Sequence, residues 1–229
     1  LWLHWLPLKH LRRGRAGKAF FRRALNAWMS ERRAHPIDPP DFFQELLSAK
    51  YDDGAAVPDE VIFQLIMFMS WAGHETTTNL IGNGLQLLID WPGERARLIA
   101  EPGLIGPAVE VLLRFESSNQ LGNRSVGVET EIGGVTMAPG SPLTLGIGAA
   151  TPDPEQFADP EGLDSVRTPT RHLAFGGGPH LCAGISLARL EGRVAIGRFL
   201  ARFPDYRPAG EAMRGGRARF RGFVALPVE

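Results

Sequence analysis

Cys182, the only cysteine among the 229 residues, lies in a glycine-rich stretch that reads Phe175-Gly176-Gly177-Gly178-Pro179-His180-Leu181-Cys182-Ala183-Gly184. Glycines allow the backbone to fold back toward the sulfur atom. The apolar-periodic segment that follows predicts a helix, whose first N–H groups and positive dipole end favour a thiolate over a thiol. A thiolate is a strong metal ligand, so this stretch predicts a metal-binding cysteine. The alternative is a small buried hydrophobic residue.

A second set of polar residues interrupts the longest apolar segment of the chain. It reads Ala72-Gly73-His74-Glu75-Thr76-Thr77, and glycine, an acid and hydroxyls are poor choices for the middle of a helix. We expect a local bulge or groove that holds a small molecule such as dioxygen, with Glu75 and Thr76 placed for proton delivery. A helix kink with incidental polar residues is the alternative. His74 would suggest a zinc peptidase only with a second histidine four residues later, where the chain has Thr78.

Both stretches resemble signatures of one family. The cysteine stretch fills every specified position of the haem-ligand loop of the cytochrome P450 family, F-x-x-G-x-H/R-x-C-x-G. The segment that begins at Ala72 is similar to the distal-helix signature of that family, A-G-x-D/E-T. The resemblance implies a haem b cofactor with the Cys182 thiolate as axial ligand. It also implies that Thr76 holds the hydrogen-bond network that protonates oxygen and that Glu75 relays protons from solvent.

The resemblance assigns further residues to the cofactor and the substrate. His180 and Arg124 are expected to bind the haem propionates, and Phe175 is expected to pack near the thiolate. His172 is a further polar support. Other cofactor contacts are expected from Gly176, Gly184, Ala72 and Gly73. Substrate contacts are expected from Met69, Gln120 and Leu121, together with Ala72 and Gly73. These residues are mostly apolar, which suggests a hydrophobic organic substrate.

One position departs from the family pattern. The helix before the β region is expected to carry Glu-x-x-Arg as a structural ion pair, and the aligned stretch is Ala108-Val109-Glu110-Val111-Leu112-Leu113-Arg114. Val111 stands where the glutamate of the motif is expected. Glu110 and Arg114 are four residues apart, which is also a salt-bridge spacing, but Glu110 is rotated by about 100° from the expected side of the helix. The sequence therefore predicts either another partner for Arg114 or a core weakened by a missing charge partner.

These residues are positioned by a mainly α fold with small β parts, an α+β arrangement. Periodicity and capping signals predict helices at residues 41–49, about 58–89, 94–100, 107–115 and 185–203. A basic amphipathic helix is predicted from residue 9, before Pro36, with an apolar face formed by Ala19, Phe20, Ala24, Ala27 and Trp28. Short strands are predicted over 124–145 and a terminal hairpin over 220–228, with irregular structure over 146–174. Before residue 73 the long helix is apolar on nearly all sides, which predicts a central position.

The composition limits the classes of binding partner and the cell compartment that we expect for this protein. The 25 basic residues balance the 25 acidic ones, which leaves no overall electrostatic case for nucleic acid or a membrane. A single cysteine excludes an internal disulfide and fits the cytoplasm. The resemblance implies dioxygen, a small hydrophobic substrate and a ferredoxin- or flavodoxin-type electron donor as partners. A basic face formed by Arg171, Arg189 and Arg193 is a candidate for contact with an acidic donor, and a solvated face is the alternative.

The resemblance covers residues 1–229 as a single, partial cytochrome P450 domain, equivalent to the C-terminal half of the family's fold or slightly more. It implies a monooxygenase that inserts one atom of dioxygen into a hydrophobic substrate. Two alternatives remain: a truncated, non-catalytic remnant without stable haem binding, and a haem-thiolate enzyme that uses peroxide. Val111 and the unmatched N-terminal half favour the first alternative, whereas Glu75 and Thr76 argue against the second.

Overall fold

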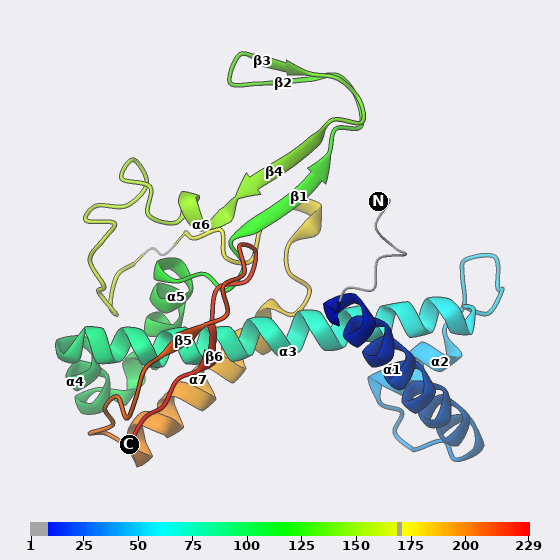
Figure 1. Ribbon diagram of the computed structural model, residues 1–229, viewed down its shortest axis with the longest axis horizontal. Helices are drawn as coiled ribbons and strands as arrows, with labels where there is room; N and C mark the ends of the chain where they lie inside the picture. The colour runs from blue at the N-terminus through cyan, green and yellow to red at the C-terminus, as the bar shows by residue number, and fades with distance from the viewer. Residues whose placement is uncertain (1–8, 169–170) are drawn as a thin grey trace. The chain divides into compact units, whose positions relative to one another are not determined.

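The computed structural model describes residues 9–168 and 171–229, with side chains described from residue 12 onward (Figure 1). This part of the chain forms two compact units, one ending at Ala72 and the other running from Gly73 to Glu229. The helices are α1 Lys9–Ala34, α2 Phe42–Ser48, α3 Asp59–Asp90, α4 Pro92–Ala100, α5 Ile105–Phe115, α6 Ile147–Ala150 and α7 Ile185–Arg202, with short 3-10 turns η1 Pro102–Leu104 and η2 Gly178–His180. The strands are β1 Leu121–Ser125, β2 Thr130–Ile132, β3 Val135–Met137, β4 Pro142–Gly146, β5 Met213–Arg214 and β6 Phe223–Ala225. The predicted mainly α fold with small sheets is confirmed.

The first unit contains α1, α2 and the first part of α3. Its core is formed by Leu25 and Met29 of α1 with Ile62 and Phe63 of α3. The predicted apolar face of α1 is wrong, because its two large members, Phe20 and Trp28, are exposed. The helical spacing is satisfied instead by Leu25 and Met29, which lie four residues apart and occupy one face.

Ion pairs hold the basic residues of α1 to acidic residues of the same unit. Arg33 donates to Asp59 at the start of α3, and Arg32 donates to Asp41 at 2.5 Å. Asp41 also caps α2 as predicted, because its side chain accepts a hydrogen bond from the backbone N–H of Gln44. The basic face of α1 is thus engaged in part within the chain.

The apolar first part of α3 is not buried as predicted. Leu65, Phe68, Met69 and Trp71 are between 40% and 60% exposed. Leu65, Phe68 and Trp71 line an open groove of about 790 Å³ within the first unit.

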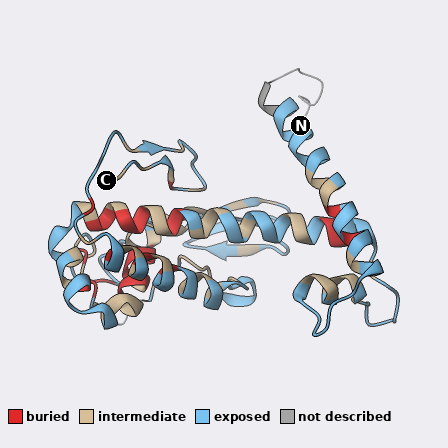
Figure 2. Cartoon of the chain, turned by 90° about the horizontal axis from the view of Figure 1, so that it is seen from below, coloured by how far each residue is buried: buried red, intermediate tan, exposed pale blue. Residues whose placement is uncertain are grey.

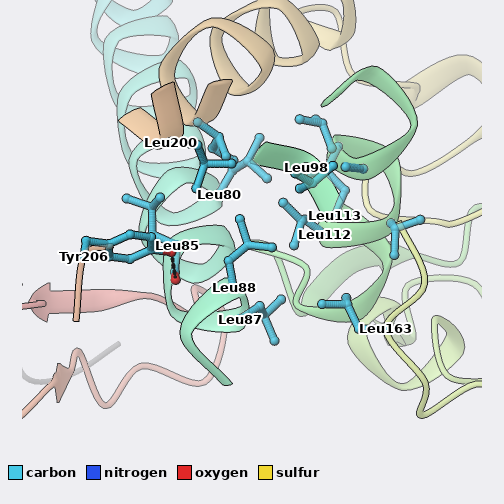
Figure 3. Packing of buried hydrophobic residues seen from close by; sticks show 14 residues of the cluster. Leu80, Leu85, Leu87, Leu88, Leu98, Leu112, Leu113, Leu163, Leu200 and Tyr206 are labelled. Atoms are coloured by element: carbon cyan, nitrogen blue, oxygen red, sulfur yellow. Dashed lines mark hydrogen bonds between the residues drawn. The ribbon is translucent and has the colours of Figure 1, made fainter. Parts of the chain in front are cut away.

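The second unit contains the larger core, built from the second part of α3 with α5 and α7. Figure 2 shows that the buried residues of α3 are concentrated in the turns of this second part. Leucines dominate the cluster, and Tyr206 closes it (Figure 3). The hydroxyl of Tyr206 donates to the backbone oxygen of Leu85 at 2.6 Å, and burial raises the pKa of this hydroxyl to about 12.

Two glycines bring α3 and α7 close together and reveal their relative direction. A Cβ atom on Gly192 of α7 would approach Leu80 of α3 to 3.0 Å, and a Cβ atom on Gly84 of α3 would approach Ile196 of α7 to the same distance. The contact between Gly84 and Ile196 lies four residues further along both helices than the contact between Leu80 and Gly192. The helices α3 and α7 therefore run in the same direction. The N-terminal end of α7 therefore lies at the same end of this helix pair as the start of the second unit's part of α3.

The strands form three two-stranded antiparallel sheets, β1–β4, β2–β3 and β5–β6. The β region begins at Leu121, slightly before the predicted residue 124. The terminal hairpin also begins earlier than predicted, because its first strand is Met213–Arg214. The segment predicted to be irregular contains the short helix α6, and the helix predicted from residue 94 begins at Pro92.

Among the described helices, none combines the length and the apolar character that crossing a lipid bilayer requires.

Candidate functional site

Backbone hydrogen bonds and glycine conformations shape the loop that carries Cys182. The backbone N–H of Cys182 donates to the carbonyl of Phe175 at 3.0 Å, which folds the loop back on itself. Gly176 and Gly178 have φ angles of +70° and +65°, in the left-handed region that favours glycine. The next residues lead directly into α7, so the sulfur is presented at the N-terminal end of that helix.

The surroundings of the sulfur fit a haem. The Cys182 side chain is half-buried, and the apolar side chains of Leu173 and Leu181 are 48% and 50% exposed. Within residues 9–168 and 171–229, no group of three or more His, Cys, Asp or Glu side chains could hold a metal ion. A metal at Cys182 would bring most of its ligands with it, as haem iron does. The exposed side chain of Leu181, next to Cys182 in the chain, suits contact with an apolar ring.

The polar stretch of α3 lies at the same end of the helix pair as the Cys182 loop. The predicted bulge is wrong, because α3 continues as an α-helix from Asp59 to Asp90. Thr78 bonds back to the preceding turn, with its hydroxyl donating to the carbonyl of His74 at 2.8 Å. Thr76 and Glu75 are half-buried on the adjoining turn.

Glu75 is held by the C-terminal segment of the chain. Its carboxylate forms an ion pair with Arg217. The contact does not have the alignment of a hydrogen bond, and Oε1 of Glu75 is buried without a hydrogen-bond donor among the described residues. The guanidinium of Arg217 therefore lies directly beside this oxygen.

Glu110 connects three separate parts of the second unit. Arg189 of α7 donates two hydrogen bonds to the Glu110 carboxylate, at 2.8 Å and 2.7 Å. His172 Nε2 lies 3.4 Å from the same carboxylate, without the alignment of a hydrogen bond. Burial alone would raise the pKa of the Glu110 carboxyl, but the nearby His172 ring and the hydrogen bonds from Arg189 outweigh burial and lower the pKa to about 2. We refer to Glu110, His172 and Arg189 as the Glu110 cluster.

The Glu110 cluster also contacts the Cys182 loop. The guanidinium of Arg189 lies 5.3 Å from the centre of the Phe175 ring, and the His172 ring lies 5.7 Å from it. Arg189 is therefore a structural partner of Glu110 and not a free member of the predicted basic face. Arg171 and Arg193 remain exposed.

Arg114 is buried and has a different set of partners from the one that the four-residue spacing suggested. It is 1% exposed and donates to the backbone carbonyls of Thr151, Pro160 and Gly162. The pair that the four-residue spacing allows between Glu110 and Arg114 is not formed, because Glu110 pairs with Arg189 of α7. The Nε atom of Arg114 is buried without an acceptor among the described residues. Burial lowers the pKa of the Arg114 guanidinium, and the nearby Arg167 charge lowers it further.

Comparison with known proteins decides the family. The family model described as Cytochrome P450 matches residues 1–105 and 109–205. The chain belongs to the cytochrome P450 family. Membership implies a haem cofactor bound through a cysteine thiolate, and Cys182 is the only cysteine available.

Curated and structurally determined cytochromes P450 are similar to most of this chain. Cytochrome P450 107B1 of Saccharopolyspora erythraea is 38% identical over 209 residues, which cover 89% of this chain and 51% of the relative. Vitamin D(3) 25-hydroxylase of Pseudonocardia autotrophica is 39% identical over 79% of this chain and 45% of its own length. The crystal structure of CYP109E1 from Bacillus megaterium in complex with testosterone matches with a TM-score of 0.88 and 29% identity, covering 96% of this chain and 61% of that one. The chain thus spans about half the length of the curated relatives it matches.

The remaining predicted residues of this cytochrome P450 lie on several elements. His180 lies on the exposed turn η2, and Arg124 is exposed on β1, where its side chain donates to the carbonyl of Asn123. Gln120 and Leu121 are half-buried at the start of β1. Met69 and Ala72 belong to the first unit. Their roles toward haem and substrate, like those of Gly73 and Gly184, stay predictions.

Sequence reasoning missed the polar stripe that α3 turns toward the C-terminal segment. Asn79 and Asn83 are buried and follow Glu75 at intervals of four residues. Asn83 donates to the backbone carbonyl of Arg221 at 2.9 Å, and a Cβ atom on Gly222 would collide with the Asn79 side chain. The four-residue spacing of these polar residues in an apolar helix was the signal that could have identified a second contact surface.

Proposed function

We propose that this chain forms the haem-binding and oxygen-activating part of a cytochrome P450 monooxygenase. Such an enzyme inserts one atom of dioxygen into a hydrophobic organic substrate and takes electrons from a separate redox partner of the ferredoxin or flavodoxin type. The observation that carries the proposal is the folded Cys182 loop at the start of α7, which runs in the same direction as the Glu75–Thr76 part of α3.

The chemistry follows from this arrangement. When bound, haem supplies iron that activates dioxygen, and a cysteine thiolate donates the electron density that favours O–O cleavage. Cys182 holds the metal, and the backbone bond to Phe175 limits the movement of its sulfur. With haem in place, Glu75 would relay protons from solvent, and the Thr76 hydroxyl on the next position would hold the hydrogen-bond network that delivers them. His180 and Arg124 pair with the haem propionates.

The substrate is apolar in this proposal. Met69, Gln120 and Leu121 contribute its contacts, together with Ala72 and Gly73. The names of two relatives support the choice, since one is a vitamin D(3) hydroxylase and the other was crystallised with testosterone. Arg171 and Arg193 form an exposed basic surface that an acidic electron donor can approach.

A specific observation favours a second candidate function. Arg114 Nε is buried without an acceptor, as expected if the ion pair of the Glu-x-x-Arg motif is missing. A core weakened in this way would give a protein with the cytochrome P450 fold that does not retain haem and has no catalytic activity.

Haem loading separates the two candidates. The purified chain is incubated with haem and reduced under carbon monoxide, and the difference spectrum is recorded. A Soret band at the position typical of thiolate ligation supports the monooxygenase, and its loss in Cys182→Ser identifies the ligand. Absence of the band from the unmodified chain, with its appearance in Val111→Glu, supports the second candidate. Absence from both rejects haem binding by this chain.

A further inference from the structure

An open pocket lies between the C-terminal segment and the end of α5. It has a volume of about 580 Å³, and its lining includes Arg214, Arg217, Arg221 and Glu116. The three guanidinium groups thus outnumber the two carboxylates beside them, since Arg214 and Arg221 pair with Glu116 and Arg217 pairs with Glu75. The rest of the lining includes Ala218 and Phe220, which add apolar surface.

Glu116 leaves most of the hydrogen-bonding capacity of these arginines unused. Its Oε1 lies 3.5 Å from Arg214 Nη1 and 3.3 Å from Arg221 Nε, so it engages one nitrogen of each. A guanidinium carries five N–H donors arranged to bind a carboxylate through two parallel hydrogen bonds. Between 46% and 53% of each of the three arginine side chains is exposed, so the donors are accessible.

The pocket is fixed to the segment that we expect to contact substrate. The N–H of Gln120 donates to the carbonyl of Arg219 at 2.8 Å, and the N–H of Arg221 donates to the carbonyl of Ser118 at 3.0 Å. Through Arg217 the pocket also reaches Glu75. An anion bound here would therefore have its apolar remainder close to Gln120 and Leu121.

Two buried polar atoms beside the pocket lack partners within the described part of the chain. They are Nδ2 of Asn79, which packs against Gly222, and Oγ of Ser118. Buried polar atoms in native proteins are nearly always hydrogen-bonded to protein, water or ligand. A water molecule or the head group of a bound ligand can supply the missing partners.

We propose that the pocket formed by Arg214, Arg217 and Arg221 binds the carboxylate of an apolar monocarboxylic acid, which is the substrate class of this protein. The choice of a single negative charge follows from Glu116 and Glu75, because both carboxylates lie beside the arginines and repel a dianion such as phosphate. The statement that the acid is a substrate rests on the proposed monooxygenase function. The binding of the acid does not depend on it.

Calorimetric titration of the full chain without haem tests the binding. Octanoate and octanamide have the same apolar chain and differ in charge at the head group. Octanoate is expected to bind at least about tenfold more tightly than octanamide, because charge-assisted hydrogen bonds form only with the acid. Equal binding of the two, or no binding of octanoate, overturns the proposal. Displacement by inorganic phosphate as effective as that by octanoate overturns the choice of a carboxylate.

Two variants act in opposite directions. Arg221→Gln is expected to weaken octanoate binding about tenfold and to leave octanamide binding unchanged. Glu116→Gln removes the competing carboxylate and is expected to tighten octanoate binding several-fold, whereas damage to the fold would weaken it. Arg207→Gln makes the same change of charge at a side chain that is 75% exposed and paired with Glu229, and it is expected to change nothing. Weaker octanoate binding by Glu116→Gln overturns the proposal even if Arg221→Gln does not fold.

The carbon monoxide spectrum of the same preparations keeps this test apart from the test of function. A chain that binds octanoate but gives no thiolate band has the acid pocket without the proposed enzyme activity. A chain that gives the band but binds octanoate no better than octanamide is a cytochrome P450 with another substrate class.

Discussion

Two charged residues one turn apart on α5 have opposite kinds of environment. Glu110 is an anion that meets two cationic or polar donors, and its carboxylate receives two short hydrogen bonds from Arg189. Arg114 is a cation that is only 1% exposed. It donates its hydrogen bonds to backbone carbonyls. The first arrangement neutralises its charge with a partner of opposite sign. The second relies on carbonyl dipoles, with Asp159 as a nearby charge of opposite sign that forms no ion pair with it among the described residues.

The difference shows how the loss of one glutamate is accommodated. With Val111 in place of the expected acid, Arg114 keeps its position through three carbonyls of the segment from Thr151 to Gly162. The neighbouring Glu110 reaches the Cys182 loop region through Arg189 of α7 and through His172. Glu110 and Arg114 therefore make different contributions to stability. Four measurements distinguish the two contributions.

The largest effect is expected from Arg114→Met. This substitution removes the donors from three buried carbonyls, and we expect it to lower the free energy of unfolding by about 3–5 kcal/mol. Urea unfolding followed by circular dichroism measures the change. Arg198→Met, at an exposed position of α7, is the matched control and is expected to have little effect. A loss no larger than that of the control would show that Arg114 is not a structural centre.

Glu110→Gln is expected to have the next largest effect. It leaves Arg189 without a counter-ion, and we expect a loss of about 2–3 kcal/mol in the free energy of unfolding. The same unfolding experiment measures it. In the haem-loaded chain, the thiolate band should also weaken, because the cluster packs against Phe175. Unchanged stability and an unchanged band would contradict a supporting role for the cluster.

The pH dependence of stability follows from the same carboxylate. Its pKa is lower in the folded protein, at about 2, than the ordinary value of 4.5 expected in the unfolded chain. The contribution of Glu110 is therefore complete above about pH 4.5 and is lost as the pH falls toward 2. Unfolding measured across this range should show a smaller decrease for Glu110→Gln than for the unmodified chain. Parallel curves would show that Glu110 does not cause the acid sensitivity.

The smallest expected effect is the coupling between positions 111 and 114. Val111→Glu introduces a carboxylate one turn before Arg114, whose Nε lacks an acceptor. We expect this glutamate to be better tolerated by about 1–2 kcal/mol beside Arg114 than in the Arg114→Met background. A double-mutant cycle on the free energy of unfolding gives this value, with Val111→Gln as the uncharged control. A coupling of zero would show that the two side chains do not meet.

Local sequence predicted much of the candidate site. The Cys182 loop was predictable because glycines at 176 and 178 are needed for left-handed backbone, and this requirement acts over a few residues. The cap at Asp41 and the extent of α3 were predictable for the same reason. The face of α1 was predicted wrongly, because apolar residues occur on more than one side of that helix and packing selects among them.

The sequence by itself determined the family, the position of the single cysteine, the helix that follows it and the helix that carries the Glu75–Thr76 stretch. Tertiary structure alone decided that Glu110 pairs with Arg189, 79 residues away, and that the C-terminal arginines lie over the polar stripe of α3. The physical reason is the distance along the chain over which each interaction acts. Backbone conformation responds to neighbouring residues, whereas the partner of a charged side chain depends on which distant elements the core brings within hydrogen-bonding distance.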